Sequence, residues 1–246
     1  MARRKGTILW SLWAAALILA QLAALLPLDS RAEAARPASA AARGGYVALT
    51  FDDGPWPETT QALLEGLAQR GVKATFFLIG SQVAGQEDLV RRMAAEGHQV
   101  GVHTWDHVQL KGMTPEQIDG QLGRCRACLQ EILGPVELMV RPPYGFVDDT
   151  LLRCAQAPII CWSVDTEDWK DRNADRIVDT VTDQVRDGSI ILMHDIFETS
   201  VEAALQCVDL LLAEDYYFVT VEELFALRGV TPEKGQVYLN LPPGTG

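Results

Sequence analysis

The chain has 246 residues, enough for one sizeable α/β domain, and 22% of its residues are charged. Its formal net charge is −12, but residues 1–43 carry six basic and two acidic side chains, so the remaining residues carry −16. A strongly acidic domain argues against nucleic acid or an anionic lipid surface as the main partner. It is compatible with a neutral or partly cationic polymer.

The first 28 residues are expected to be a targeting segment. A basic stretch at residues 3–5 precedes an apolar run of about residues 8–28, and Ala-x-Ala triplets follow at 32–34 and 38–40. This order is typical of a secretory signal peptide with its cleavage site. The run is also close to the roughly 20 apolar residues that span a bilayer, so a retained membrane anchor is the alternative. In both interpretations the segment contacts a membrane at least transiently, and the bulk of the chain lies outside the cytoplasm.

Residues 29–43, which are rich in Ala, Arg and Pro, are expected to be a linker, and residues 44–246 a single folded domain. Within that domain, short apolar runs alternate with patterns of helical period. The strand candidates are 46–51, 74–79, 99–103, 137–141, 158–164, 189–193 and 216–220. The helix candidates are 59–70, 86–96, 115–132, 148–155, 173–186, 199–213 and 221–227.

We expect these strands to form a parallel sheet covered by helices. Most of the runs are continuously apolar and rich in β-branched or aromatic residues, which is typical of strands that are buried on both faces. About seven successive strand–helix units favour an α/β fold that closes into a distorted (β/α) barrel over an open doubly wound sheet. No G-x-G-x-x-G follows the first strand candidate and no Walker loop is present, so nucleotide binding has no support.

Two adjacent carboxylates, Asp52 and Asp53, follow directly on the first apolar run. Two like charges this close repel each other unless a cation lies beside them. A metal ion is the usual cation in such a place. The alternative is that the pair is an ordinary turn or helix cap, which is a common use of aspartate.

Two of the four histidines, His103 and His107, follow another strand candidate and lie four residues apart. One helical turn would place both imidazoles on the same side. The alternative is a helix face with one buried and one solvated ring. Two histidines and one aspartate form a three-ligand set for a borderline divalent metal and leave a position open for water. A third histidine, His194, ends a later apolar run, where an acid–base group would be expected.

The polar candidates share one position in the predicted fold, the carboxyl ends of strands. They are Asp52, Asp53, His103, His107, Arg141, Asp165 and His194. In a barrel these ends gather on one face, where active sites form, so residues about 140 positions apart would meet. Singly, each has an ordinary structural explanation, such as a surface cation for Arg141 or a loop acid for Asp165. The combination points to a site.

The domain contains an odd number of cysteines, so at least one is free or intermolecular if the chain is oxidised. They are Cys125, Cys128, Cys154, Cys161 and Cys207. Cys125 and Cys128 have the spacing of a redox pair or of half a zinc site. Their neighbours are typical of the middle of a helix, and no second Cys-x-x-Cys is present, so we expect a packing role. The sequence leaves the disulfide pairing open.

Five motifs in this order resemble those of the NodB-homology polysaccharide deacetylases, the carbohydrate esterases of family four. They are Thr-Phe-Asp-Asp-Gly-Pro at 50–55, His-Thr-Trp-Asp-His at 103–107, Arg-Pro-Pro-Tyr-Gly at 141–145, Asp-Thr-Glu-Asp-Trp at 165–169 and Leu-Met-His-Asp at 192–195. The run Ala-Thr-Phe-Phe-Leu at 74–78 is similar to the family's second strand. The resemblance covers about residues 46–228, with Met193 standing where Leu is common. It implies a distorted (β/α) barrel.

The resemblance also implies the roles of the central residues. Asp53, His103 and His107 would bind a divalent metal ion, with zinc as the first expectation and cobalt, nickel or manganese as alternatives. Asp52 would be the general base that takes a proton from the attacking water. His194 would be the general acid that protonates the leaving amine.

Further residues of the same motifs would assist. By the resemblance, Arg141 would hold and tune the base, and Asp165 would orient the acid and raise its pKa. The backbone N–H of Tyr144 would stabilise the oxyanion. The residues expected to contact the substrate are Tyr144, Pro143, Trp169 and Leu192, of which the last two would form an apolar pocket for the acetyl methyl group.

The activity implied is removal of N-acetyl groups from an extracytoplasmic GlcNAc-type polysaccharide, with release of acetate. Peptidoglycan is the first expectation, because the chain is expected to be exported. Chitin oligomers and O-acetyl xylan are the alternative substrates. A glycan-binding wall protein without catalysis is a further alternative, but it would be expected to lack at least one ligand or catalytic residue. We expect an acetylated glycan as the partner, no nucleic acid, and a monomer.

Overall fold

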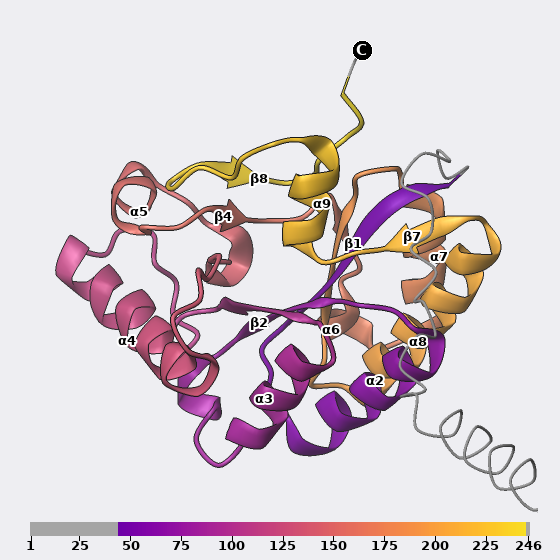
Figure 1. The fold of residues 1–246 in the computed structure, drawn as a ribbon, viewed down its shortest axis with the longest axis horizontal. Coiled ribbons are helices and arrows are strands. Elements are labelled where there is room, and N and C mark those ends of the chain that lie inside the picture. Colours follow the sequence, from indigo (N-terminus) through magenta and orange to yellow (C-terminus); the bar gives the residue numbers. More distant parts are fainter. Residues whose placement is uncertain (1–43, 245–246) are drawn as a thin grey trace, which may run out of the picture. The chain divides into compact units, whose positions relative to one another are not determined.

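The computed structural model describes residues 44–244, in which helices surround a central parallel sheet (Figure 1). The predictions for residues 1–43 lie outside these residues. The strands are β1 (Gly45–Asp52), β2 (Thr75–Leu78), β3 (Gln99–Val102), β4 (Ile159–Ile160), β5 (Val164–Asp165), β6 (Ile190–His194), β7 (Tyr216–Phe218) and β8 (Val237–Tyr238). The helices are α2 (Pro57–Arg70), α3 (Glu87–Ala95), α4 (Pro115–Leu133), α5 (Asp149–Cys154), α6 (Asp168–Asp171), α7 (Ala174–Gln184), α8 (Glu198–Ala213) and α9 (Val221–Arg228), with short 3₁₀ turns η1 (Gly80–Gln82) and η2 (Pro143–Gly145).

The main sheet is parallel and has β1 at its centre. Its strand order is β3-β2-β1-β6-β5, and β7 pairs with the first residues of β1. A second pair, β4 and β8, is joined to the main sheet through Val140, which forms single bridges to Val102 and to Ile159. The chain continues from β4 directly into β5, which is the last strand of the main sheet. The pairings therefore lead from β3 through Val140 and β4 back to β5, and they close the sheet into a ring. The result is the distorted barrel that the sequence predicts.

Two of the predicted strands differ most from the expectation. The candidate at 137–141 contributes only the bridges of Val140, and the candidate at 158–164 is divided into β4 and β5. The division has a clear cause in the hydrogen bonds. The Cys161 N–H donates to the Tyr238 carbonyl (2.8 Å), whereas the Ser163 N–H donates to the Ile190 carbonyl (3.0 Å). The stretch therefore changes its partner from β8 to β6 between these residues. Strand β8, helix α6 and both 3₁₀ turns are elements that the sequence did not predict.

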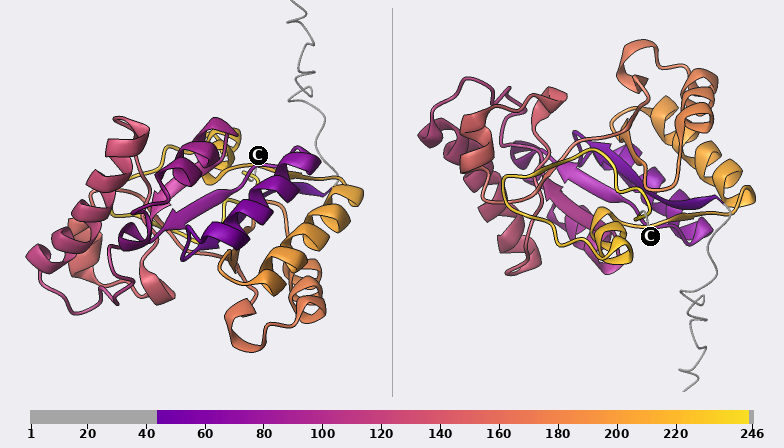
Figure 2. Two further views of the ribbon diagram at one scale, coloured as in Figure 1. Left: turned by 90° about the horizontal axis from the view of Figure 1, so that it is seen from below. Right: turned by 90° about the horizontal axis from the view of Figure 1, so that it is seen from above.

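The seven predicted helices are all present and cover the outside of the strands, as both perpendicular views in Figure 2 show. Helix α8 packs between α2 and α7, and α3 packs on α4. Inside, Phe51 of β1 and Phe76 of β2 stack with ring centroids 5.4 Å apart and are fully buried. Burial of such a side chain contributes about 1.5–3 kcal/mol. Among residues 44–244, no helix combines the length and the apolar character that crossing a membrane requires.

All five cysteines are free thiols in this structure. Burial raises the pKa of Cys125 and of Cys207 to about 12, which keeps both thiols protonated and unreactive. Cys125 lies in the middle of α4 and its thiol donates to the Leu78 carbonyl (3.5 Å). The Cys-x-x-Cys pair therefore has the packing role expected from its helical surroundings.

Candidate active site

The carboxyl ends of the strands bring the predicted polar residues into one cavity. Asp52 is the last residue of β1 and lies opposite His194, the last residue of β6, in the parallel register. β3 ends one residue before His103. The cavity has a volume of about 370 Å³, and its walls are formed by Asp52, Asp53, His103, His107, Tyr144, Trp162, Asp165, Trp169, Leu192 and His194.

Asp53, His103 and His107 converge within this cavity. The Asp53 Oδ1 lies 3.4 Å from His103 Nε2 and 3.2 Å from His107 Nε2, and the three ligand atoms lie within 4.8 Å of one another. Asp53 Oδ1 is buried and has no hydrogen-bond partner. A buried oxygen that faces two imidazole nitrogens is costly unless a cation lies among them. Two imidazoles and one carboxylate are also the donor types that zinc and similar divalent ions accept, so the residues fit a metal ion.

The two adjacent aspartates point to different partners. Asp53 has a left-handed backbone (φ 73°), which turns its side chain away from the direction of Asp52. Gly54 follows, and a Cβ there would lie 2.6 Å from a carboxylate oxygen of the buried Asp195. The turn therefore needs glycine, and it separates two carboxylates that would otherwise repel each other.

The segment that carries His103 and His107 is a loop, and the helical turn predicted for it is wrong. Thr104 (φ 67°) and His107 (φ 54°) have left-handed backbones, which no helical turn would contain. The loop is fixed to the η1 turn by a backbone hydrogen bond, in which the Gly80 N–H donates to the Thr104 carbonyl (3.0 Å). It is also held from α4, where Gln121 Oε1 accepts from the N–H groups of Trp105 and Asp106 (3.0 Å each). Backbone bonds thus bring the two imidazoles together.

His103 is oriented so that its Nε2 faces Asp53. Its Nδ1 lies 2.7 Å from the Arg141 carbonyl, which can only accept, so Nδ1 carries the proton and Nε2 presents a lone pair. Burial alone would lower the pKa of His103, but the charges of Asp52 and Asp53 raise it overall. Burial likewise acts to raise the pKa of Asp53, and the charges of His103, His107 and His194 bring it below its ordinary value.

Asp52 is fixed by a buried arginine. Arg141 is completely inaccessible to solvent, and its Nη1 donates to Asp52 Oδ1 (2.8 Å) and to Thr50 Oγ1 (2.7 Å). Its remaining donors reach the carbonyls of Ile160 (3.1 Å) and Cys161 (3.0 Å). A buried guanidinium with all these partners is a rigid cation. It leaves the other oxygen of Asp52 directed toward the cavity, 3.7 Å from His103 Nε2.

The partner of His194 is Asp168, and the prediction that Asp165 holds this histidine is wrong. Asp168 Oδ1 lies 2.7 Å from His194 Nδ1, and Asp168 Oδ2 accepts the His194 backbone N–H (2.8 Å). Asp168 is fully buried. Burial acts to lower the pKa of His194, but the hydrogen bond and charge of Asp168 outweigh it and raise the pKa to about 9. His194 is therefore a protonated imidazolium at neutral pH.

Asp165 has a different position because the chain turns directly after β5. Its Oδ1 accepts the Glu167 N–H (3.0 Å), and Glu167 has a left-handed backbone (φ 49°). This turn carries the chain into α6 and places Asp168 beneath His194. Asp165 is exposed and forms part of the cavity wall. The motif Asp-Thr-Glu-Asp-Trp contains both acids. The sequence therefore indicated that this motif carries the partner of His194, but it did not indicate which of the two acids that partner is.

Aromatic side chains form the outer wall of the cavity. Trp169 is 53% exposed and Tyr144 58% exposed, while Leu192 is nearly buried among them. Trp162, which lies outside the sequence motifs, also lines the cavity. Pro143, predicted to contact substrate, is buried beneath the turn and does not line the cavity. Its constrained ring stiffens η2, in which Tyr144 has a left-handed backbone (φ 64°).

This combination of fold and site agrees with comparisons to known proteins. Residues 39–158 match the family model described as polysaccharide deacetylase. A peptidoglycan-N-acetylglucosamine deacetylase of Bacillus cereus is 37% identical over 186 residues, covering 73% of this chain and 68% of the relative. The peptidoglycan-N-acetylglucosamine deacetylase PgdA of Listeria monocytogenes is 42% identical over 179 residues, covering 73% of this chain.

Solved structures agree with this result. The chain resembles a family 4 acetyl xylan esterase from Clostridium thermocellum, solved in complex with a cobalt ion, with a TM-score of 0.77 and 33% identity. The similarity covers 80% of this chain and 99% of that one. The chain therefore belongs to the polysaccharide deacetylase family, a family of metal-dependent hydrolases. The match spans 38% of the length of the Listeria relative.

Proposed function

We propose that the chain removes N-acetyl groups from an extracytoplasmic GlcNAc-type polysaccharide, with peptidoglycan as the first substrate and acetate as a product. One observation carries the proposal. A carboxylate fixed by Arg141 (Asp52) and an imidazolium fixed by Asp168 (His194) lie at adjacent strand ends of one cavity that also contains the metal-ligand set. A base and an acid on either side of a metal position is the arrangement that amide hydrolysis needs.

Asp53, His103 and His107 are the residues that would hold the metal ion, with zinc as the first candidate and cobalt, nickel or manganese as alternatives. Such an ion, when bound, supplies a water of lowered pKa and polarises the carbonyl of the acetyl group. The orphaned oxygen of Asp53 and the fixed Nδ1–H tautomer of His103 support this assignment.

The remaining chemistry belongs to the protein's own groups. Asp52, paired with the Arg141 guanidinium, accepts the proton of the attacking water. His194 donates from Nε2 to the leaving amine, because Asp168 occupies its Nδ1 side. The Tyr144 backbone N–H stabilises the oxyanion, and Trp169 and Leu192 enclose the acetyl methyl group.

Support for a glycan substrate comes from the rim of the cavity and from the relatives. Exposed aromatic rings at the rim, Tyr144 and Trp169, offer flat apolar faces that can lie against sugar rings. The Bacillus and Listeria relatives are named for peptidoglycan. An N-terminal segment that is a signal peptide or a membrane anchor would deliver the enzyme to the cell envelope, where such a substrate lies.

The direct test is mass spectrometry of peptidoglycan fragments after incubation with zinc-loaded protein. We expect loss of acetyl groups, and the fragment masses report which sugar loses them. The Asp52→Asn protein should keep its metal and lose about 10²- to 10⁴-fold in rate, the range for removal of a general base. Full activity of Asp52→Asn would overturn the assignment of the base.

The likeness to a family 4 acetyl xylan esterase favours one second candidate, hydrolysis of O-acetyl esters. The same base, acid and metal ligands would serve an ester, whose leaving group is an alcohol instead of an amine. Acetate release from acetylated xylan, chitin oligomers and peptidoglycan, measured side by side at equal acetyl concentration, separates the candidates. Acetate from xylan with none from any GlcNAc polymer would contradict the amide-hydrolase proposal.

A further inference from the structure

Beside the cavity, Phe146 and Lys111 form a pair that the chemistry described above does not use. Phe146 follows the η2 turn and is 47% exposed, although it is a large apolar side chain. The ammonium of Lys111, which comes from the segment between β3 and α4, lies 5.8 Å from the centre of the Phe146 ring. Within residues 44–244, no carboxylate lies within ion-pair distance of that ammonium. We refer to Phe146 and Lys111 together as the platform.

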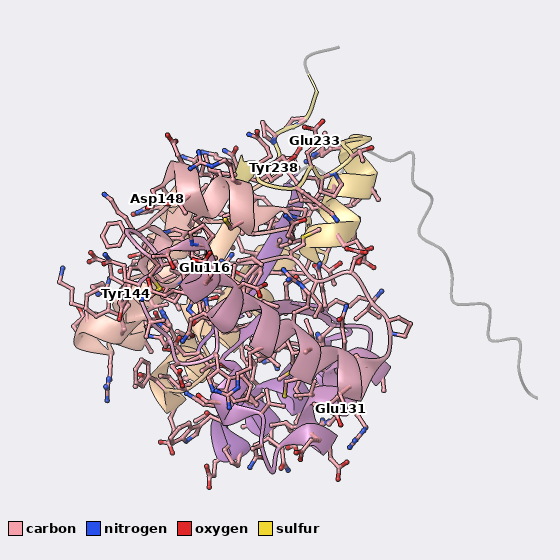
Figure 3. The ribbon with its side chains drawn as sticks, turned by 90° about the vertical axis from the view of Figure 1, so that its left-hand side faces the viewer. Glu116, Glu131, Tyr144, Asp148, Glu233 and Tyr238 are labelled. Carbon is pink, nitrogen blue, oxygen red and sulfur yellow. The ribbon has the colours of Figure 1, made fainter. Side chains whose placement is uncertain are left out.

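The two segments of the platform are tied together by Asp148. Its Oδ2 accepts the Gly112 N–H (2.8 Å), next to Lys111, and its Oδ1 accepts the Leu151 N–H (2.9 Å) at the start of α5. Asp148 lies two residues after Phe146. One side chain therefore fixes both parts of the platform, and its oxygens are occupied by backbone donors. Figure 3 shows Tyr144 and Asp148 on the same side of the molecule.

The platform is continuous with the site. The His107 ring lies 5.1 Å from the Tyr144 ring, which in turn lies 6.4 Å from the Phe146 ring. Each step is a ring-to-ring contact, and the last ring ends at Lys111. The Lys111 charge lowers the pKa of Asp148, after the larger effect of the backbone hydrogen bonds to that carboxylate, but the two groups form no ion pair. A row of aromatic rings that begins at a metal ligand and ends at an ammonium without an ion pair among residues 44–244 is suited to a polymer that carries carboxylates at intervals along a chain of rings.

We propose that Phe146 and Lys111 form a subsite for a sugar next to the one that is deacetylated, in a glycan that bears carboxylates. The Phe146 ring lies against the sugar, and the Lys111 ammonium attracts a carboxylate of a substituent such as the stem peptide of peptidoglycan. This inference rests on the proposed function and makes it more specific. A neutral polymer such as chitin would use the ring alone, so the platform favours peptidoglycan over chitin.

The test compares two ligands that differ only in their carboxylates: glycan strands with their stem peptides, and the same strands after carbodiimide coupling to ammonia has converted the carboxylates to neutral amides. Lys111→Met, Phe146→Ala, Phe146→Tyr and the control Lys234→Met are assayed for kcat/KM and KM on both. Lys234 is an exposed lysine at the opposite, amino-terminal ends of the strands. Binding of the same strands to Asp52→Asn proteins with and without each change, measured by calorimetry, reports on the platform without turnover.

We expect Lys111→Met to raise KM about threefold to fivefold on strands with free carboxylates at low salt, with a smaller change at high salt and little selectivity for charged over amidated strands remaining. Phe146→Ala should weaken both ligands, Phe146→Tyr should restore binding, and Lys234→Met should match the unchanged protein. Equal effects of Lys111→Met on charged and uncharged strands, or unchanged binding in both platform variants, would overturn the proposal. Absence of acetate release by the unchanged protein from any glycan would instead overturn the proposed function, and the calorimetric binding would still decide the subsite.

Discussion

Two histidines at the same end of the barrel differ in the partner of their Nδ1 atom, and the difference separates a metal ligand from an acid. The Nδ1–H of His103 donates a hydrogen bond to the backbone carbonyl of Arg141. The Nδ1–H of His194 donates a hydrogen bond to the buried carboxylate of Asp168. A neutral carbonyl fixes the orientation of a ring, and the Arg141 carbonyl raises the pKa of His103 less than the nearby carboxylates do. A carboxylate fixes the orientation and stabilises the imidazolium.

The Nε2 sides of the two rings complete the contrast. His103 Nε2 faces Asp53 and Asp52 at 3.4 and 3.7 Å, and these charges raise the pKa of His103 despite its burial. The acids thus favour a positive charge at the position that a metal ion would take. Burial lowers the pKa of His194, but the hydrogen bond and charge of Asp168 on its Nδ1 side outweigh burial and raise this pKa to about 9. The same side chain type serves two purposes because its neighbours differ.

The largest effect should come from removing the metal-ligand histidine. His103→Ala takes away one of three ligands and leaves Asp53 facing a cavity with less positive charge. We expect this protein to lose stoichiometric metal by elemental analysis and to release no detectable acetate. If it retains one equivalent of metal after dialysis, the ligand assignment is wrong.

Removing the acid should affect the rate and spare the metal. His194→Gln keeps a polar side chain of similar size but cannot donate a proton to an amine leaving group. We expect kcat to fall about 10²- to 10⁴-fold, with zinc still bound stoichiometrically. Loss of metal together with activity would mean that His194 belongs with the ligands, which would remove the contrast between the two histidines.

Asp168→Asn should shift the pH dependence of the reaction. His194 donates only while protonated, so activity in the unchanged protein is present below the pKa of His194 and is lost as the pH rises through it. Without the charge of Asp168, burial remains as a cause that lowers this pKa. We expect the alkaline limb of kcat/KM to move to lower pH. A bound metal ion lowers the pKa of His194, and with it the pH of the alkaline limb, in both proteins. The quantity to measure is therefore the difference in that pH between Asp168→Asn and the unchanged protein.

The matched control for this pH experiment is Asp165→Asn, at the acid that the sequence favoured. Asp165 holds a turn through the Glu167 N–H and does not contact His194. An alkaline limb that moves in Asp165→Asn and stays in place in Asp168→Asn would restore the original assignment. Rate losses alone would not decide, because either acid could act on local structure.

A smaller effect is expected at Gln121, which holds the ligand loop from α4. Its Oε1 accepts two N–H groups, and its Nε2 donates to Asp106 Oδ2 (3.2 Å). Gln121→Leu removes all three bonds and should weaken zinc binding about 10- to 100-fold, as loss of an outer partner of a metal site usually does. Gln121→Glu keeps the acceptor for both N–H groups and should recover part of the affinity. Equal zinc affinity in all three proteins, measured by competition with a chelator, would show that the loop needs no support from α4.

The elements that the sequence predicted well have continuous apolar runs or clear helical periods. β1 and β6 are almost entirely buried, so their composition reports their position in the sheet. The parallel register then places Asp52 opposite His194, and convergence of the strand ends follows from the fold class. Arg141 was foreseen through the resemblance, and its bond to Asp52 is present in the structure.

The errors occur where backbone conformation is set by distant contacts. The turn through Thr104 requires a positive φ in a residue other than glycine, and it is stabilised by Gly80 and Gln121 from elsewhere in the chain. No local periodicity encodes it. The choice between two acids three residues apart depended on the left-handed Glu167 in the same way. Pro143 was expected in contact with substrate because of its motif, but the turn directs it inward.

The central claim is that the cavity catalyses deacetylation only with a metal ion bound by Asp53, His103 and His107. The measurement that tests it most directly is acetate release from peptidoglycan by chelator-treated protein, verified as metal-free by elemental analysis, during titration with zinc. The account predicts no acetate without metal and activity that rises to a maximum at one equivalent of zinc. Acetate released at the full rate by the metal-free protein would contradict it.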